Sequence, residues 1–152
     1  MSHPSNTLKE VEEAIDNVIQ SLIDGQEGLT QIADELKDET YKRYFLAESL
    51  KRAQFRGDLE TILHQEGVHD IKESGSAGGA VLRTWGNLKS ALGGGDHTLL
   101  ETAEQGEDAA VEAYTDALNR ELPLPIRQIL ATQSAHIQAS HDYIKAARDS
   151  SE

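Results

Sequence analysis

Cysteine is absent from this 152-residue chain, and aromatic residues make up only 5% of it. The lack of cysteine excludes a disulfide framework, a thiolate nucleophile and a cysteine-based zinc site, and it fits a reducing compartment. Basic residues are also scarce: 14 lysines and arginines face 27 aspartates and glutamates, which gives a formal net charge of -13. This acidity argues against nucleic-acid or anionic-lipid binding, because both need clustered basic side chains.

Long apolar runs are missing as well, since no stretch approaches the length of a membrane span. The polar N-terminus, Met1–Thr7, lacks the basic and apolar regions of a signal peptide. We therefore expect a soluble, cytoplasmic protein that binds neither membranes nor nucleic acid. The length predicts a single domain, 1–152, large enough for a real hydrophobic core.

Helix-forming residues recur along the chain, with apolar side chains at the three-and-four spacing of an amphipathic helix. Capping boxes at Thr7 and Thr98 mark two of the expected helix starts. Gly25 and Gly28 weaken the middle of the first helix, but its apolar stripe resumes in phase, which favours one continuous helix. The predicted long helices run from Ser5 or Thr7 to about Leu36, from Glu39 to Gln65, from Asp96 or Thr98 to about Arg120, and from about Pro125 to Arg148.

A glycine-rich connection of about 67–95 separates the second and third helices. It contains an amphipathic segment, Ala80–Leu92, which we predict to be a helix docked on the bundle through Trp85. Connections this long have a topological purpose, and here a crossover would make the second and third helices parallel. The predicted fold is all-α: a ferritin-like antiparallel four-helix bundle with a helix-containing crossover between helices two and three.

Two acids, Glu48 and Glu107, interrupt the apolar faces of the second and third helices. A buried carboxylate is costly unless it is paired, protonated or bound to a metal. Folding each antiparallel pair about its turn brings the polar interruptions of all four helices to one depth. The predicted polar core layer comprises Gln26, Glu48, Arg52, Glu107, Gln133, His136 and His141.

Ferritin-like bundles hold two metal ions with one glutamate from each of two helices and a Glu-x-x-His motif from each of the other two. Candidate ligands for iron, manganese or zinc are Glu27, Glu48, Glu104, Glu107 and His136. The motifs are incomplete, because Lys51 stands where a histidine is needed and Gln133 where a glutamate is needed. Arg52 opposes a dication and neutralises a carboxylate instead. We therefore expect a polar layer in place of an intact di-iron centre, with Glu48 on Arg52 and Glu107 on Gln133 or His136.

Four segments have the character of motifs: Ser76–Leu88 leading into Trp85-Gly86-Asn87-Leu88-Lys89, Glu101–Asp108, Leu122-Pro123, and Gln133 through His141-Asp142. With these segments, nearly the whole chain resembles a bacterial family of unknown function that is described as a four-helix bundle of the ferritin-like superfamily. The resemblance implies the fold, suggests a metal, and implies no particular reaction.

Three functional hypotheses follow. The leading one is a non-enzymatic ferritin-like bundle with a degenerate polar core, a stress-associated binding or scaffold protein without catalytic residues. The alternative is a metal-binding protein or oxidase that uses Glu48, Glu104 or Glu107, and His136. The third is a homo-oligomeric interaction module, for instance a homodimer, in which the crossover around Trp85 presents apolar surface.

Overall fold

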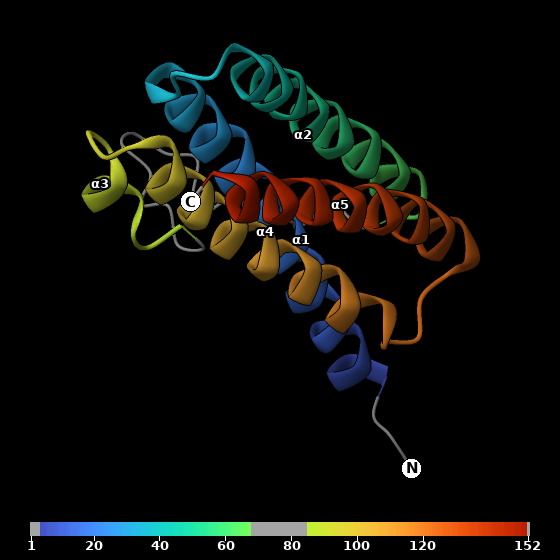
Figure 1. Cartoon of the computed structure of the whole chain (residues 1–152). Coiled ribbons are helices and arrows are strands. Elements are labelled where there is room, and N and C mark those ends of the chain that lie inside the picture. Colours follow the sequence, from blue (N-terminus) through green and yellow to red (C-terminus); the bar gives the residue numbers. More distant parts are fainter. Residues whose placement is uncertain (1–3, 68–84, 152) are drawn as a thin grey trace.

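Four long helices dominate the computed structural model, which describes residues 4–67 and 85–151. They are α1 Pro4–Glu35, α2 Glu39–Gln65, α4 Asp96–Leu118 and α5 Leu124–Ser150, and a short helix, α3 Leu88–Ala91, precedes α4 (Figure 1). The described residues contain no strand, so the predicted all-α class is confirmed. None of the described helices is both long enough and apolar enough to cross a membrane.

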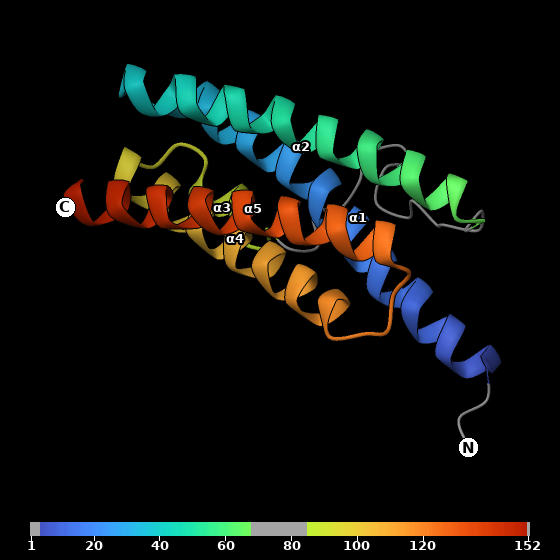
Figure 2. The same cartoon turned by 90° about the vertical axis from the view of Figure 1, so that its right-hand side faces the viewer.

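The helix directions follow from the short links between α1 and α2 and between α4 and α5, and from hydrogen bonds that join the start of α4 to the first of these links. α1 packs against α2 and α4, and α5 packs against α4 and α2 (Figures 1 and 2). The Asp96 carboxylate, at the start of α4, accepts hydrogen bonds from the backbone N–H groups of Lys37 and Asp38 at 2.9 and 3.0 Å. The turn between α1 and α2 therefore lies at the same end of the bundle as the start of α4. Consequently α2 and α4 run parallel, as the long crossover predicts.

The helix ends agree with the predicted ones within a few residues, and α4 begins at Asp96, one of its two predicted starts. Asp38 caps α2, with its side chain accepting a hydrogen bond from the backbone N–H of Tyr41 at 3.1 Å. The capping box at Thr98 is wrong, because α4 already begins at Asp96 after Gly95. Similarly, α1 is helical from Pro4, before Thr7, and proline is well suited to a first helical turn.

The crossover helix is shorter than predicted where the structure describes it. Residues 80–84 lie outside the described ranges, and 85–87 form a turn before α3. Trp85 nevertheless docks on the bundle and is only 3% exposed. A Cβ atom on Gly28 would lie 2.5 Å from the Trp85 ring, and one on Gly106 would lie 2.2 Å from it. The indole thus packs against the glycine backbones of α1 and α4, and its apolar surface is used within the chain.

The buried apolar residues form two clusters, one toward each end of the bundle. On α1 the first cluster reaches Ile23 and the second begins at Leu29, and on α5 they are separated between Ile137 and Ile144. The corresponding gaps lie between Phe45 and Phe55 on α2 and between Ala103 and Ala110 on α4. The predicted core carboxylates, Glu48 and Glu107, fall within these gaps.

Candidate functional site

Arg52 is the centre of the polar layer and is completely buried. Its Nη1 atom lies 2.6 Å from Glu107 Oε1, and its Nη2 atom lies 2.7 Å from Glu107 Oε2. Nη2 also lies 3.3 Å from Glu48 Oε2 and donates to the Ser140 hydroxyl at 3.1 Å. A Cβ on Gly25 would lie 3.3 Å from Nη1. The glycine of α1 therefore leaves room for the guanidinium.

Glu48 extends this layer toward the surface. Its Oε1 and Oε2 atoms lie 2.9 and 3.1 Å from His136 Nε2. The His136 side chain is about one-third exposed, whereas that of Glu48 is 8% exposed. The imidazole also packs edge-on against Phe55, with 5.2 Å between the ring centroids. His136 thus closes the layer between α2 and α5, and Glu48 is held by one cation and one imidazole.

Gln133 belongs to a second, neutral part of the layer. Its Oε1 atom accepts a hydrogen bond from the Tyr114 hydroxyl at 2.7 Å, and its Nε2 atom donates to the Phe55 carbonyl at 3.0 Å. The sequence-based pairing of Glu107 with Gln133 or His136 is wrong, because both Glu107 oxygens contact Arg52. A guanidinium matches the two oxygens of a carboxylate in a fork that a single amide cannot provide.

Burial and charge set the protonation states in this layer. Burial of Arg52 lowers its pKa, but Glu107 and then Glu48 more than compensate, so the net pKa is raised. Burial raises the pKa of Tyr44 to about 12, with the negative charge of Glu48 adding to the shift and a hydrogen bond with Ser140 opposing it. Burial likewise raises the pKa of Tyr114. The layer therefore holds a permanent guanidinium among neutral phenols.

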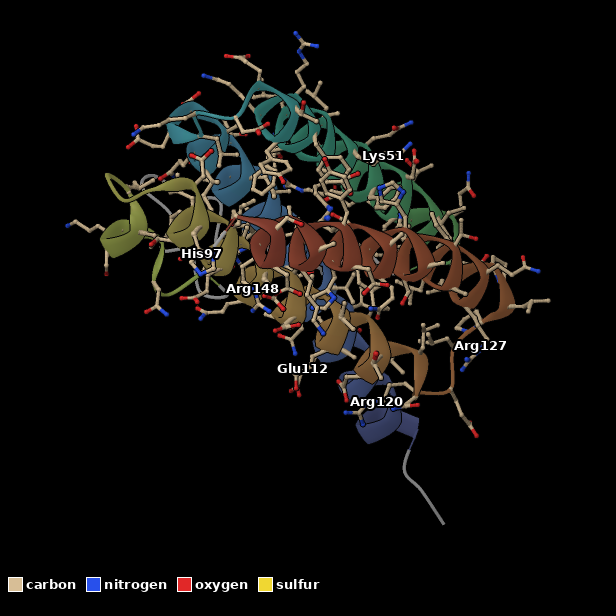
Figure 3. All side chains as sticks on the ribbon, in the orientation of Figure 1. Lys51, His97, Glu112, Arg120, Arg127 and Arg148 are labelled. Carbon is tan, nitrogen blue, oxygen red and sulfur yellow. The ribbon has the colours of Figure 1, made fainter. Side chains whose placement is uncertain are left out.

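Gln26 and Glu27 contribute differently from the other predicted layer and ligand residues. The backbone carbonyl of Gln26 accepts from the Ser49 hydroxyl at 2.9 Å, which places α1 and α2 in the predicted register. Glu27 is exposed, and both residues line a surface pocket of about 320 Å³ between α1 and Arg56. Lys51 extends over the Phe55 ring, 5.8 Å from its centroid, on the outer side of the layer (Figure 3).

Glu104 and His141 form a separate cluster between α4 and α5, together with Asp108. Their three ligand atoms, one from each residue, lie within 4.8 Å of one another. His141 Nε2 is 2.6 Å from Asp108 Oδ1 and 3.9 Å from Glu104 Oε2, while Arg148 forms an ion pair with the other oxygen of Glu104. Burial lowers the pKa of His141, but Asp142, Asp108 and Glu104 together raise it.

Ser140, Tyr44 and Asp108 are among the residues of these two groups that sequence reasoning missed. Ser140 lies one turn beyond His136 on the buried face of α5, and a stricter reading of that face would have found it. Tyr44 reaches Ser140 from α2, a contact that gives no signal in the sequence. Asp108 follows Glu104 by four residues, and the antiparallel register of α4 and α5 brings His141 to their level.

The comparisons with known proteins identify the family. Residues 10–120 match the model of a family described as Domain of unknown function (DUF2383). This chain belongs to that family. The match to DUF2383 contains Glu48, Arg52 and Glu107 and ends before α5, which carries His136 and His141. Among curated proteins, none matches the chain.

Proposed function

We propose that this protein is a non-enzymatic ferritin-like bundle, with residues 1–152 as one domain, that acts as a binding or scaffold protein. In this proposal an ion-pair network occupies the core layer where di-iron bundles hold their metal ions. The observation that carries it is the contact of both Nη atoms of Arg52 with both carboxylate oxygens of Glu107. A metal ion on Glu107 would have to displace a buried guanidinium and then remain beside its positive charge.

The two incomplete ligand motifs support the same proposal. Lys51 takes the histidine position after Glu48, and its ammonium group lies over Phe55. Gln133 takes the glutamate position before His136, and both ends of its amide are already hydrogen-bonded. A neutral amide engaged in this way is a poor substitute for a bridging carboxylate.

The competing function is a metal-binding protein or oxidase that uses Glu48, Glu104 or Glu107, and His136. The contact of His136 with Glu48 at 2.9 Å favours it, because imidazole and carboxylate are common metal ligands. Elemental analysis of protein purified from cells grown with iron, manganese and zinc separates the two functions. We expect no stoichiometric metal that depends on Glu107, and no consumption of oxygen on addition of ferrous iron.

Two matched variants make this experiment specific. Glu107→Gln removes the core charge while keeping the side-chain shape, and Asp108→Asn changes the next residue, which lies in the separate cluster with His141. Bound iron or manganese that is retained in Asp108→Asn but lost in Glu107→Gln would overturn the non-enzymatic proposal. If metal is lost only in Asp108→Asn, the non-enzymatic proposal for the core layer stands, and the metal is bound by the cluster that contains Asp108 and His141.

The homodimer remains a prediction for the same binding or scaffold role. Trp85 cannot supply the apolar contact surface that the sequence predicted, because its ring is buried against Gly28 and Gly106. Sedimentation at tens of micromolar, well above typical micromolar dissociation constants, tests self-association directly. A monomer throughout this range would contradict the homodimer.

A further inference from the structure

We propose that Glu104, Asp108 and His141 form a binding site for one divalent transition-metal ion of the zinc class, at the edge of the bundle between α4 and α5. One ligand atom from each residue lies within 4.8 Å of the others. Glu104 and Asp108 are one helical turn apart on α4, so their carboxylates project on the same side. This site goes beyond the proposed function, which concerns the core layer around Arg52.

The orientation of His141 is the first supporting observation. Its Nδ1 atom lies 3.1 Å from Asp142 Oδ1, and that same oxygen accepts from Gln138 Nε2 at 3.0 Å. Nε2 consequently faces Asp108 and Glu104. A carboxylate behind a histidine is the usual arrangement that fixes the tautomer and ring direction of a metal ligand.

The carboxylate of Glu104 is the second supporting observation. Glu104 is 9% exposed, and its buried Oε1 atom has no hydrogen-bond partner of good geometry. That oxygen forms an ion pair with Arg148, whose side chain is about one-quarter exposed, on the α4 side of α5 (Figure 3), while the Oε2 atom lies 3.9 Å from His141 Nε2. A buried carboxylate that is incompletely solvated costs free energy. A cation that binds the carboxylate directly offsets this cost.

The ligand types indicate the class of metal. One imidazole with two carboxylates suits zinc or manganese, whereas calcium and magnesium prefer oxygen ligands throughout. Three protein ligands leave a coordination position for water, as in zinc sites that are open to solvent. The Asp108 side chain is 61% exposed, so an ion can reach the site from solution.

The cluster is separate from the core layer, although Glu107 lies between its two acids in the sequence. Glu107 is fully buried and holds Arg52, whereas Asp108 faces His141 at the surface. Substitution of the rim residues therefore leaves the core ion pair in place.

A calorimetric titration with zinc tests the proposal. It uses the full chain, freed of metal by a chelator, near neutral pH. We expect one ion per chain, with affinity reduced at least about tenfold in Asp108→Asn and in His141→Ala. Cobalt is a second probe, because its absorption spectrum reports ligand number and geometry directly. Helical content of each variant is checked by circular dichroism; the Asp108 side chain is 61% exposed and that of His141 is 14% exposed, so Asp108→Asn is the variant that perturbs the fold least.

Two controls sharpen the outcome. Asp116→Asn removes an acid of α4 that pairs with Arg120 and should leave zinc affinity unchanged. Arg148→Gln should strengthen binding, because it removes the cation that competes for Glu104. The absence of saturable binding up to about 1 mM zinc would overturn the proposal, because a dissociation constant above this concentration is far weaker than that of a specific site. So would equal affinity in the wild type, Asp108→Asn and His141→Ala, or weaker binding in Arg148→Gln.

Discussion

The Arg52 guanidinium lies in a two-point contact with the Glu107 carboxylate, at 2.6 and 2.7 Å, across the centre of the bundle. The two residues come from parallel helices, α2 and α4, and both are completely buried. Each charge is therefore stabilised by the other and by few other groups. Removal of one partner leaves the other buried without its closest opposite charge, which is less favourable than loss of both.

Glu107→Ala should accordingly lower the free energy of unfolding by about 3–5 kcal/mol. The double variant Arg52→Met with Glu107→Leu should be less destabilised than the sum of its two single variants, because Arg52 and Glu107 are removed together, although Glu48 keeps only its contact with His136. Urea denaturation followed by circular dichroism measures both. Additivity of the two single variants within about 0.5 kcal/mol would contradict the coupling.

An exposed ion pair on the same helix provides the control for this prediction. Asp116 pairs with Arg120 at 3.3 Å, and both side chains are more than one-third exposed. Since solvent screens such pairs, Asp116→Ala should change stability by less than about 1 kcal/mol. A comparable loss in Asp116→Ala and Glu107→Ala would show that burial is not the deciding factor.

Gly106→Ala should displace the Trp85 ring, because the new methyl group would meet it at 2.2 Å. We expect a loss of about 1–3 kcal/mol from overpacking, together with a red shift of the single tryptophan's fluorescence as it becomes hydrated. Gly57→Ala is the matched control, since its Cβ position in α2 meets no described atom within 4 Å beyond the adjoining residues and backbone of its own helix. That variant should instead gain about 0.5–1 kcal/mol from higher helix propensity, with unchanged fluorescence.

The ionisation of Tyr44 predicts a loss of stability in alkali. Burial raises the pKa of this phenol from 10.0 to about 12. Between these values the unfolded chain releases the Tyr44 proton while the folded chain retains it, so stability is fully present below pH 10 and falls as pH rises toward 12. Tyr44→Phe should show a shallower decline in chemical denaturation over this range. An identical pH dependence in the two proteins would contradict the prediction.

Asp96 joins the start of α4 to the turn between α1 and α2 through two backbone N–H groups. Asp96→Ala should lower the free energy of unfolding by about 1–3 kcal/mol, because both charge-assisted hydrogen bonds are lost. Asp96→Asn keeps one acceptor oxygen and should lose about half as much. Thermal melts of the two variants test this order, and equal melting temperatures for Asn and Ala would count against it.

Helix periodicity and turn signals were sufficient to predict four long helices and their pairing. The depth alignment also succeeded locally: Ser49 contacts the carbonyl of Gln26, and Glu48 contacts His136, as helices of these lengths and directions require. Asp96 was one of two predicted starts of α4, but its contacts with the backbone N–H groups of a distant turn were not predicted. Local capping motifs carry no information about such contacts.

The sequence by itself determined that acids interrupt two apolar helix faces and that Lys51 and Gln133 leave both Glu-x-x-His patterns incomplete. Only the tertiary structure decided which charges meet. Arg52 lies four residues after Glu48 and was expected to pair with it, yet its closest contacts are with Glu107, because the packing of α2, α4 and α5 brings a planar carboxylate opposite its two Nη atoms. Local spacing fixes which residues share a helix face, whereas the depth and rotation of packed helices fix the partner across the core.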